Sequence, residues 1–329
     1  MAKIYYDSDV DFKALSGKTI AIIGYGSQGR AHALNLRDSG LNVVVGLRKE
    51  GASWRVASGD GFKPMEVGKA CAKADVIMIL TPDTTHSSIY LTSIRDNLKT
   101  GKALGFAHGY AIRFGLIKPP KDVDVFMVAP KGPGAKVRET YLNEFGVPAL
   151  VAVEQNYSGQ AKELALAYAK GLGATKAGVV ETTFAEETES DLLGEQAVLV
   201  GGVMSLIEKG YEVLTEAGYQ PELAYFEVCN ELKLIVDLIY AKGFKGMLNS
   251  VSDTAKYGGL TRGYDIVDEH VKQNMKKALE EIKRGDFARE WTGDVEMSTK
   301  RLAEMMAKMD EKEIEKVGRI IRKLAGIEK

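Results

Sequence analysis

Residues 18–29, KTIAIIGYGSQG, join a short β-branched run to a glycine-rich turn, and the helical pattern RAHALNLRDSG follows. The spacing G-x-G-x-x-G between a strand and a helix is typical of dinucleotide binding. Gly24 permits the tight turn, Gly26 lets the backbone approach a pyrophosphate, and Gly29 allows close packing of the helix against the strand. The amide groups at the start of the helix then face the phosphates. A tight turn without a ligand is the alternative interpretation.

The next strand indicates which dinucleotide to expect. Strand 42–47, NVVVGL, is followed by Arg48 and Lys49, where an NAD site usually has an acidic residue that binds the ribose diol. Two cations, with Ser53 a little further on, suit a 2′-phosphate, so the loop favours NADP(H). Glu50 could accept the ribose hydroxyls and admit NADH. A solvated loop is the alternative for the two cations.

Alternating strand and helix patterns continue along the first half of the chain. We expect strands at 75–80, 103–107, 124–129, about 149–153 and about 178–182, with a helix at about 158–171. Strands that alternate with helices predict an α/β fold with a mainly parallel, doubly wound sheet of the Rossmann type. Ligands bind outside the carboxyl ends of the strands in such a sheet.

Polar residues stand at these predicted strand ends. His108 and Lys131 each follow a strand directly or by one residue. A histidine there can position or transfer protons near neutral pH, and a lysine can hold an anion. His86 is expected to border the cofactor. A structural histidine and a surface lysine are the alternatives for His108 and Lys131.

The β pattern ends after Thr182, and the rest of the chain is predicted to be helical. The expected helices are about 186–209, 210–217, 221–242, 265–284 and 298–324. We therefore predict a dinucleotide-binding domain at 1–182 and an all-α domain at 183–329. The first and third helices are too apolar for a solvated layer, which favours an obligate interface. The polar turn 247–259 contains hydroxyls, including Ser252, that could bind a substrate carboxylate or cap a helix.

Two apolar helices carry acidic pairs one turn apart, Asp191 with Glu195 and Glu227 with Glu231. A helix places residues four apart on one face. Like charges about 4 Å apart repel by roughly 4 kcal/mol at an effective dielectric of 20, and burying them unpaired costs more. A hard divalent cation would remove that cost, and oxygen ligands suit Mg²⁺. Solvated acidic faces are the alternative, because such pairs are common in helices.

The composition argues against several classes of protein. The chain has 329 residues, which suggests two domains, and its formal net charge of −1 marks neither a nucleic-acid binder nor a membrane-surface binder. Cys71 and Cys229 make no metal-type cluster or disulfide framework, which fits a cytoplasmic setting. The N-terminus has no apolar signal core, and the apolar run near 197–207 is too short and glycine-broken to span a membrane.

Six segments in order resemble the short, class I form of ketol-acid reductoisomerase, and the likeness covers essentially the full chain. They are GYGSQGRAHALNLRDSG, GFAHGY, APKGPG, EETESDLLGEQAVL, FEVCNELKLIVDLIY and NSVSDTAKYGG. The resemblance implies conversion of 2-acetolactate or 2-aceto-2-hydroxybutyrate to the 2,3-dihydroxy acid, in the pathway to valine, isoleucine and leucine. It also implies an intertwined or knotted helical domain, an exception to the usual avoidance of knots.

The resemblance implies a role for each acidic pair. Asp191 bridges two Mg²⁺ ions, Glu195 binds one of them, and Glu227 and Glu231 bind the other. The second pair comes from the partner subunit of an interlocked dimer. Glu231 could also contact the substrate hydroxyl and relay its proton.

The resemblance also identifies substrate and cofactor residues. Ser252 contacts the substrate, and His108 is the catalytic histidine, acting through water and orientation. The NADP(H) ligands that it implies are Tyr25, Gly26, Ser27, Gln28, Arg48, Ser53, Asp83, Thr84, Thr85, His86 and Gly134. Two departures are small: Thr84 stands where an acidic residue often follows the aspartate, and Lys256 stands where glutamate is usual.

Two other interpretations stay open at this point. An NADP-linked β-hydroxyacid dehydrogenase also joins a Rossmann half to a helical half, but it needs no metal. A non-catalytic dinucleotide-binding protein could use its helical half only to dimerise. Neither needs clustered acids on two helices, and fold analogy alone does not decide function.

Overall fold

The computed structural model describes residues 2–328, and its contacts divide the chain into two compact units. The first unit is Met1–Ser190 and the second is Asp191–Lys329. The division lies within helix α8, Phe184–Gly194. The predicted domain boundary, residue 182, lies just before this helix and stays a prediction.

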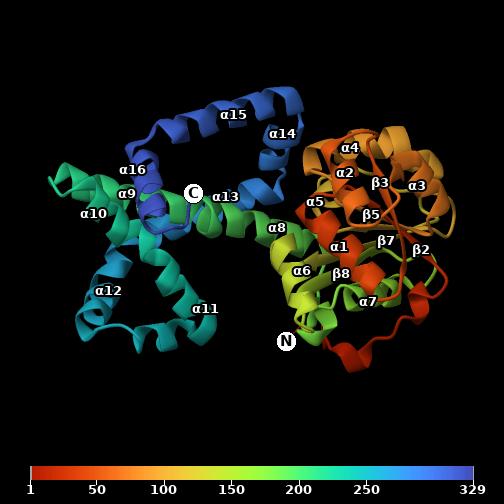
Figure 1. Cartoon of the computed structure of the whole chain (residues 1–329), viewed down its shortest axis with the longest axis horizontal. Coiled ribbons are helices and arrows are strands. Elements are labelled where there is room, and N and C mark those ends of the chain that lie inside the picture. The colour runs from red at the N-terminus through yellow and green to blue at the C-terminus, as the bar shows by residue number, and fades with distance from the viewer. Residues whose placement is uncertain (1, 329) are drawn as a thin grey trace. The chain divides into compact units, whose positions relative to one another are not determined.

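The first unit contains a nine-stranded sheet in the order β1-β9-β8-β7-β6-β5-β2-β3-β4. Figure 1 labels β2, β3, β5, β7 and β8 of this sheet, with helices around them. The strands are β1 Ile4–Tyr5, β2 Thr19–Ile23, β3 Asn42–Leu47, β4 Met65–Glu66, β5 Val76–Ile79, β6 Ala103–Phe106, β7 Asp124–Pro130, β8 Ala149–Gln155 and β9 Val179–Glu181. Strands β4, β3, β2, β5, β6 and β7 are parallel, whereas β8 is antiparallel to β7 and β1 to β9. The predicted, mainly parallel α/β sheet is confirmed.

Helices cover both faces of this sheet, because the side chains of each strand alternate between two cores. In β2, Ile20 and Ile22 join one core, while Ala21 and Ile23 join the other. The first core includes side chains of α1 and α7, and the second includes side chains of α3 and α5. The helices are α1 Ser27–Asp38, α2 Ala52–Gly59, α3 Val67–Lys73, α4 Asp83–Ile89, α5 Tyr110–Arg113, α6 Gly134–Leu142 and α7 Ala161–Gly171.

The described residues of the second unit, 191–328, form helices joined by turns and contain no strand, as predicted. Its helices are α9 Gly201–Glu216, α10 Pro221–Tyr225, α11 Leu232–Leu248, α12 Asp253–Ile266, α13 Glu269–Lys283, α14 Asp286–Thr292, α15 Val295–Glu311 and α16 Glu313–Leu324. Two π-helical segments, Glu195–Leu199 and Phe226–Asn230, interrupt the regular helices. The unit has a small core of its own, built around Tyr211, Tyr225 and Ile321.

Three predicted helix boundaries are wrong in this unit. No break occurs at residue 210, because a β-carbon on Gly210 would lie only 3.1 Å from Val228, so the glycine serves packing and does not end the helix. The predicted helix 298–324 is divided at Lys312, whose backbone is extended. The turn predicted at 247–259 ends early, because α12 begins at Asp253.

The absence of a break at residue 210 produces a long apolar helix, Phe184–Glu216, of 33 residues. By length and composition alone this helix could cross a membrane, and the apolar run near 197–207 is only part of it. Asp191 and Glu195 lie within it. Acidic groups inside a membrane are costly and rare, which argues against a membrane span here.

Candidate cofactor and metal site

The candidate site is built on the carboxyl ends of β2, β5, β6 and β7, which are consecutive parallel neighbours in the sheet. Gly24 follows β2 directly, His108 comes two residues after β6, and Lys131 follows β7 directly. Parallel strands end at the same edge, so the sequence placed these three residues at one edge correctly.

Each glycine of the loop after β2 is required for a different reason. Gly24 has a φ of +100°, and a β-carbon there would lie 2.7 Å from the carbonyl oxygen of Leu80. A β-carbon on Gly29 would lie 2.3 Å from the carbonyl oxygen of Gly24. Gly26, in contrast, precedes α1 and has open space where its side chain would be. The loop therefore leaves room for a ligand at Gly26, as a pyrophosphate cradle requires.

The loop after β7 lies against the start of α1. Gln28 donates from Nε2 to the carbonyl oxygen of Gly132 at 2.9 Å. A β-carbon on Gly134 would lie 2.1 Å from the carbonyl oxygen of Ser27. Gly134 thus has a packing role in addition to the cofactor contact predicted for it.

Tyr25, which was predicted to bind the cofactor, has its side chain directed into the protein. Its ring is 5% exposed, and its hydroxyl donates to Asp60 Oδ2 at 3.0 Å. Burial, followed by this hydrogen bond, raises the pKa of the Tyr25 hydroxyl. Only the backbone of Tyr25 is left to approach a phosphate.

The loop between β3 and α2 carries the residues predicted to bind the 2′-phosphate. Arg48 and Lys49 are exposed, and Ser53 is the second residue of α2. Glu50 has a φ of 60°, an uncommon backbone conformation for a residue other than glycine. A cavity of about 730 Å³ adjoins the loop and is lined by Leu47, Arg48, Lys49, Glu66, Val67, Gly68, Lys69, Ala72, Ile89, Ser93 and Asn97.

The predicted cofactor segment Asp83–His86 forms the first turn of α4, directly beyond β5. His86 is buried, and its Nε2 lies 2.8 Å from the carbonyl oxygen of Thr81. Burial lowers the pKa of His86, although the nearby charge of Asp83 opposes that shift. Thr85 donates to the carbonyl oxygen of Pro82. His86 is therefore anchored within the protein and helps to shape the wall at this strand end.

Glu187 joins the two polar residues that the sequence placed at strand ends. Its carboxylate is 1% exposed. Its Oε2 lies 3.0 Å from His108 Nδ1 and accepts from the amide of Gly109 at 3.0 Å, and its Oε1 accepts from Lys131 Nζ at 3.2 Å. A buried carboxylate with this many donors is well satisfied.

Electrostatics keep Glu187 ionised. Burial by itself would raise the pKa of Glu187, but the hydrogen bond and charge of His108, the charge of Lys131 and the Gly109 amide together lower it. Sequence reasoning missed this residue. The signal was present, because Glu187 lies one helical turn before Asp191 and continues the same acidic face of α8.

The first acidic pair lies at the end of α8. The ligand atoms of His108, Glu187 and Asp191 lie within 4.8 Å of one another, the one group of its kind among residues 2–328. Glu195 follows Asp191 by one turn and begins the first π-helical segment. Such π-helical turns are frequent at functional sites.

The second acidic pair is part of the other π-helical segment. Glu227 lies within Phe226–Asn230 and Glu231 follows it, and both side chains are exposed. Neither belongs to the three-residue group above, nor to any comparable group within residues 2–328. One chain therefore does not assemble the four predicted metal ligands.

Ser252 is the N-cap residue of α12, where its Oγ accepts from the amide of Ala255 at 3.2 Å. Capping was one of two roles that the sequence left open for this hydroxyl. The structure confirms the capping role, and contact with the substrate stays a prediction.

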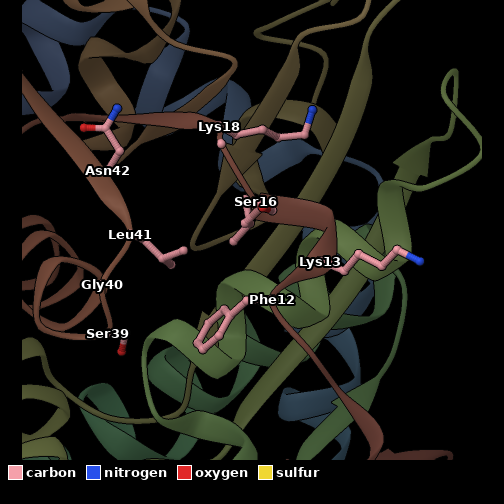
Figure 2. Close-up of a pocket in the computed structure, with 10 residues that line it drawn as sticks. Phe12, Lys13, Ser16, Lys18, Ser39, Gly40, Leu41 and Asn42 are labelled. Carbon is pink, nitrogen blue, oxygen red and sulfur yellow. The ribbon is translucent and has the colours of Figure 1, made fainter.

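A cavity of about 630 Å³ lies at the opposite edge of the sheet, beside the amino ends of β2 and β3. Figure 2 shows Phe12 and Leu41 turned toward its centre, and the amino groups of Lys13 and Lys18 directed away from it. Ligands of doubly wound sheets bind at the carboxyl ends of strands, so this cavity is not the expected cofactor site.

Two family models match consecutive parts of the chain. The model described as "Acetohydroxy acid isomeroreductase, NADPH-binding domain" matches residues 14–178. The model described as "Ketol-acid reductoisomerase, C-terminal domain" matches residues 184–326. Together the two matches cover nearly all of the chain.

Comparison with individual proteins also identifies ketol-acid reductoisomerases as similar to this chain. Ketol-acid reductoisomerase (NADP(+)) from Pyrobaculum arsenaticum is 61% identical over 98% of this chain and 99% of its own length. The protein of that name from Pyrococcus abyssi is 56% identical over 100% of this chain and 99% of its own. A solved structure of an NADH-preferring ketol-acid reductoisomerase from an uncultured archaeon superposes with a TM-score of 0.94, at 49% identity, covering 98% of this chain and 99% of that one.

Proposed function

The chain belongs to the ketol-acid reductoisomerase family, and we propose that it converts 2-acetolactate to 2,3-dihydroxy-isovalerate with NADPH and two Mg²⁺ ions. The membership confirms the predicted family, the Rossmann-like fold with a helical second part, and the NADP-linked enzyme class. We extend the proposal to 2-aceto-2-hydroxybutyrate, which would give 2,3-dihydroxy-3-methylvalerate. Both reactions would serve branched-chain amino-acid biosynthesis in the cytoplasm. The match of the two family models, which together cover nearly all of the chain, carries the proposal.

The reaction combines two steps at one site. An alkyl group migrates to a neighbouring ketone carbon after the tertiary hydroxyl loses its proton, and the new ketone is then reduced. Negative charge develops on adjacent oxygens in both steps. When bound, Mg²⁺ stabilises that charge and acidifies the hydroxyl, and NADPH provides the hydride. The protein must therefore hold hard cations next to the nicotinamide end of the sheet edge.

The acidic residues of α8 fit this requirement. Asp191 and Glu195 offer only carboxylate oxygens, which are the ligands that Mg²⁺ prefers. We assign Asp191 the bridging position, because its short side chain can present both oxygens to two ions. Glu187 is a poor candidate for a ligand, since His108, Gly109 and Lys131 already use both of its oxygens.

Glu187 instead positions the side chains above the sheet edge. By binding Nδ1 of His108 it fixes the imidazole ring and selects its tautomer. By binding Lys131 it places an ammonium group where a substrate anion would lie. We assign His108 a role in orientation and proton transfer through water, and Lys131 a role in binding the substrate's negative charge.

A homodimer would complete the site. We propose that Glu227 and Glu231 of the partner subunit provide the remaining metal ligands, with Glu231 also relaying the substrate's proton and Ser252 binding substrate. Large apolar side chains exposed in the single chain support such an interface. They include Val198, Leu199, Val200, Leu206, Leu234, Tyr240, Phe244, Tyr257, Tyr264 and Ile266. In this family-based proposal the two helical parts are intertwined.

The direct test follows NADPH oxidation by absorbance, with 2-acetolactate as substrate. We expect turnover to need Mg²⁺, to fall by about a hundredfold or more with EDTA, and to return when Mg²⁺ is added in excess. Identification of the dihydroxy acid as product would confirm both steps. Turnover that resists EDTA would favour the metal-free β-hydroxyacid dehydrogenase interpretation instead.

Cofactor preference is tested by the substitution Arg48→Glu. We expect NADPH binding to weaken by roughly 1.5–3 kcal/mol more than NADH binding, because a charge-assisted contact to the 2′-phosphate is lost. Binding titrations with both cofactors measure the difference. Arg55→Glu makes the same charge change on an exposed position of α2 and serves as the matched control. Equal weakening of both cofactors would show that Arg48 does not bind the 2′-phosphate.

A further inference from the structure

We propose that Asp60 is a positioning residue that joins the two phosphate-binding loops of the cofactor site and so sets the preference for NADPH over NADH. The proposal rests on the cofactor placement proposed above. Asp60 is the C-cap residue of α2 and lies outside the glycine motif and outside the loop after β3. Its side chain nevertheless contacts the glycine motif, and α2 connects it to the loop after β3.

The first link runs to the glycine loop. The carboxylate of Asp60 accepts from the hydroxyl of Tyr25 at 3.0 Å. It also forms a bidentate pair with Arg30 in the first turn of α1, with Nε 2.7 Å from Oδ2 and Nη2 2.8 Å from Oδ1. Charge-assisted, bidentate contacts of this kind are geometrically demanding. Asp60 thereby holds the second residue of the glycine motif and the start of the helix that faces the pyrophosphate.

A second layer of contacts supports this arrangement. Arg37 donates to the backbone oxygen of Asp60 at 2.7 Å, and its guanidinium lies 4.9 Å from the ring centroid of Phe62. The Phe62 ring makes an edge contact with Tyr25, with centroids 5.9 Å apart. Asp60 and Phe62, two residues after it, are therefore both held against α1 and the glycine loop.

The other link runs through α2. This helix is only eight residues long, Ala52–Gly59, and Ser53 stands in its first turn, directly after the Arg48–Gly51 loop. Ala57 is fully buried in the core of the sheet unit, so the helix is anchored as a rigid element. A shift of its C-terminal end at Asp60 must therefore also move the end that carries Ser53.

Binding of the pyrophosphate and binding of the 2′-phosphate should then both change when Asp60 is replaced. The pyrophosphate depends on the glycine loop, and the 2′-phosphate depends on the loop before α2. Without Asp60 these two loops lose their common attachment. NADPH, which uses both loops, should be affected more than NADH, which lacks the 2′-phosphate. This separates a positioning role from a general loss of stability, which would weaken both cofactors alike.

The test uses the full chain and compares Asp60→Ala with Tyr25→Phe, which removes only the tyrosine hydroxyl. We expect the ratio of NADPH affinity to NADH affinity to fall by about fivefold or more in Asp60→Ala and by a smaller factor in Tyr25→Phe. The KM for NADPH should rise by a larger factor than kcat falls. Tyr25→Phe retains the Arg30–Asp60 pair, so it tests the link even if Asp60→Ala folds poorly.

A double-mutant cycle with Arg48→Ala measures the coupling directly. If Asp60 positions the 2′-phosphate loop, Arg48→Ala should weaken NADPH binding less in the Asp60→Ala background than in the natural chain. Asp286→Ala is the matched control, since Asp286 is also paired with an arginine, Arg284, at 2.6 Å but makes none of the contacts described for Asp60.

Two outcomes would overturn the inference. One is equal weakening of NADPH and NADH in both variants, and the other is additive behaviour in the cycle. Either result, obtained with a natural chain that binds NADPH and reduces 2-acetolactate, would leave the proposed function intact. Failure of the natural chain to reduce 2-acetolactate would instead contradict the proposed function itself.

Discussion

Replacing Asp191 with asparagine should lower turnover of 2-acetolactate by about a thousandfold, equivalent to about 4 kcal/mol of transition-state stabilisation, while NADPH still binds. Asparagine keeps the shape of the side chain but removes the negative charge and one anionic oxygen. A bridging ligand needs both oxygens, so a neutral amide cannot hold two Mg²⁺ ions close together. The cofactor loops belong to other elements of the sheet unit and should bind NADPH unchanged.

Two measurements make this prediction specific. Steady-state turnover measured at increasing Mg²⁺ concentrations tests whether the lower turnover results only from weaker metal binding. A fluorescence titration measures NADPH binding. Asp310→Asn is the control, because Asp310 is an exposed aspartate of α15 and belongs neither to the acidic pairs nor to the side chains named for the proposed interface. It should retain normal turnover. Near-normal activity of Asp191→Asn with excess Mg²⁺ would reject the bridging role.

The second prediction is that substitutions at two glycines of the same loop have different effects, one on stability and the other on cofactor affinity. Gly29→Ala should destabilise the fold by about 2–3 kcal/mol, because its β-carbon would meet the Gly24 carbonyl oxygen at 2.3 Å. Gly26→Ala should change stability by less than about 1 kcal/mol, because the space at Gly26 is open. The methyl group added by Gly26→Ala would instead occupy the position proposed for the pyrophosphate. The Kd for NADPH should therefore rise by about a hundredfold.

Thermal unfolding and cofactor titration together test this pair of variants. Gly59→Ala is the control, since a β-carbon there has no atom within 4 Å and α2 ends at this residue. It should lower neither stability nor affinity. If Gly26→Ala bound NADPH normally, the pyrophosphate would not lie over Gly26, and the cofactor placement proposed here would need revision.

The sheet half could be predicted because its signals are local. A β-branched run, a glycine turn and a helical pattern each concern neighbouring residues, and parallel pairing follows from their alternation. The helical half was predicted less well at its boundaries. Gly210 looks like a helix breaker in sequence, yet it lies within a continuous helix because Val228 packs against it. Tertiary packing overrode local preference there.

In the candidate site, too, some residues could be predicted from local sequence and others only from the tertiary structure. His108 and Lys131 could be placed at strand ends from the sequence, because the carboxyl ends of parallel strands share an edge. Glu187 and Asp60 could not be identified as their partners. Glu187 is 79 positions from His108, and Asp60 is 35 positions from Tyr25. No local pattern encodes a contact over such separations.

The order of the residues was thus sufficient to determine the strand–turn–helix that receives a dinucleotide, the change from α/β to all-helical structure, and the acidic spacing on two helices. These features depend on periodicity and backbone sterics over a few residues. Only the folded chain decided that a buried glutamate joins His108 to Lys131, and that one aspartate fastens α2 to the glycine loop. Those contacts arise when distant segments pack together, because a charged group that loses contact with water then requires partners that its own segment does not provide.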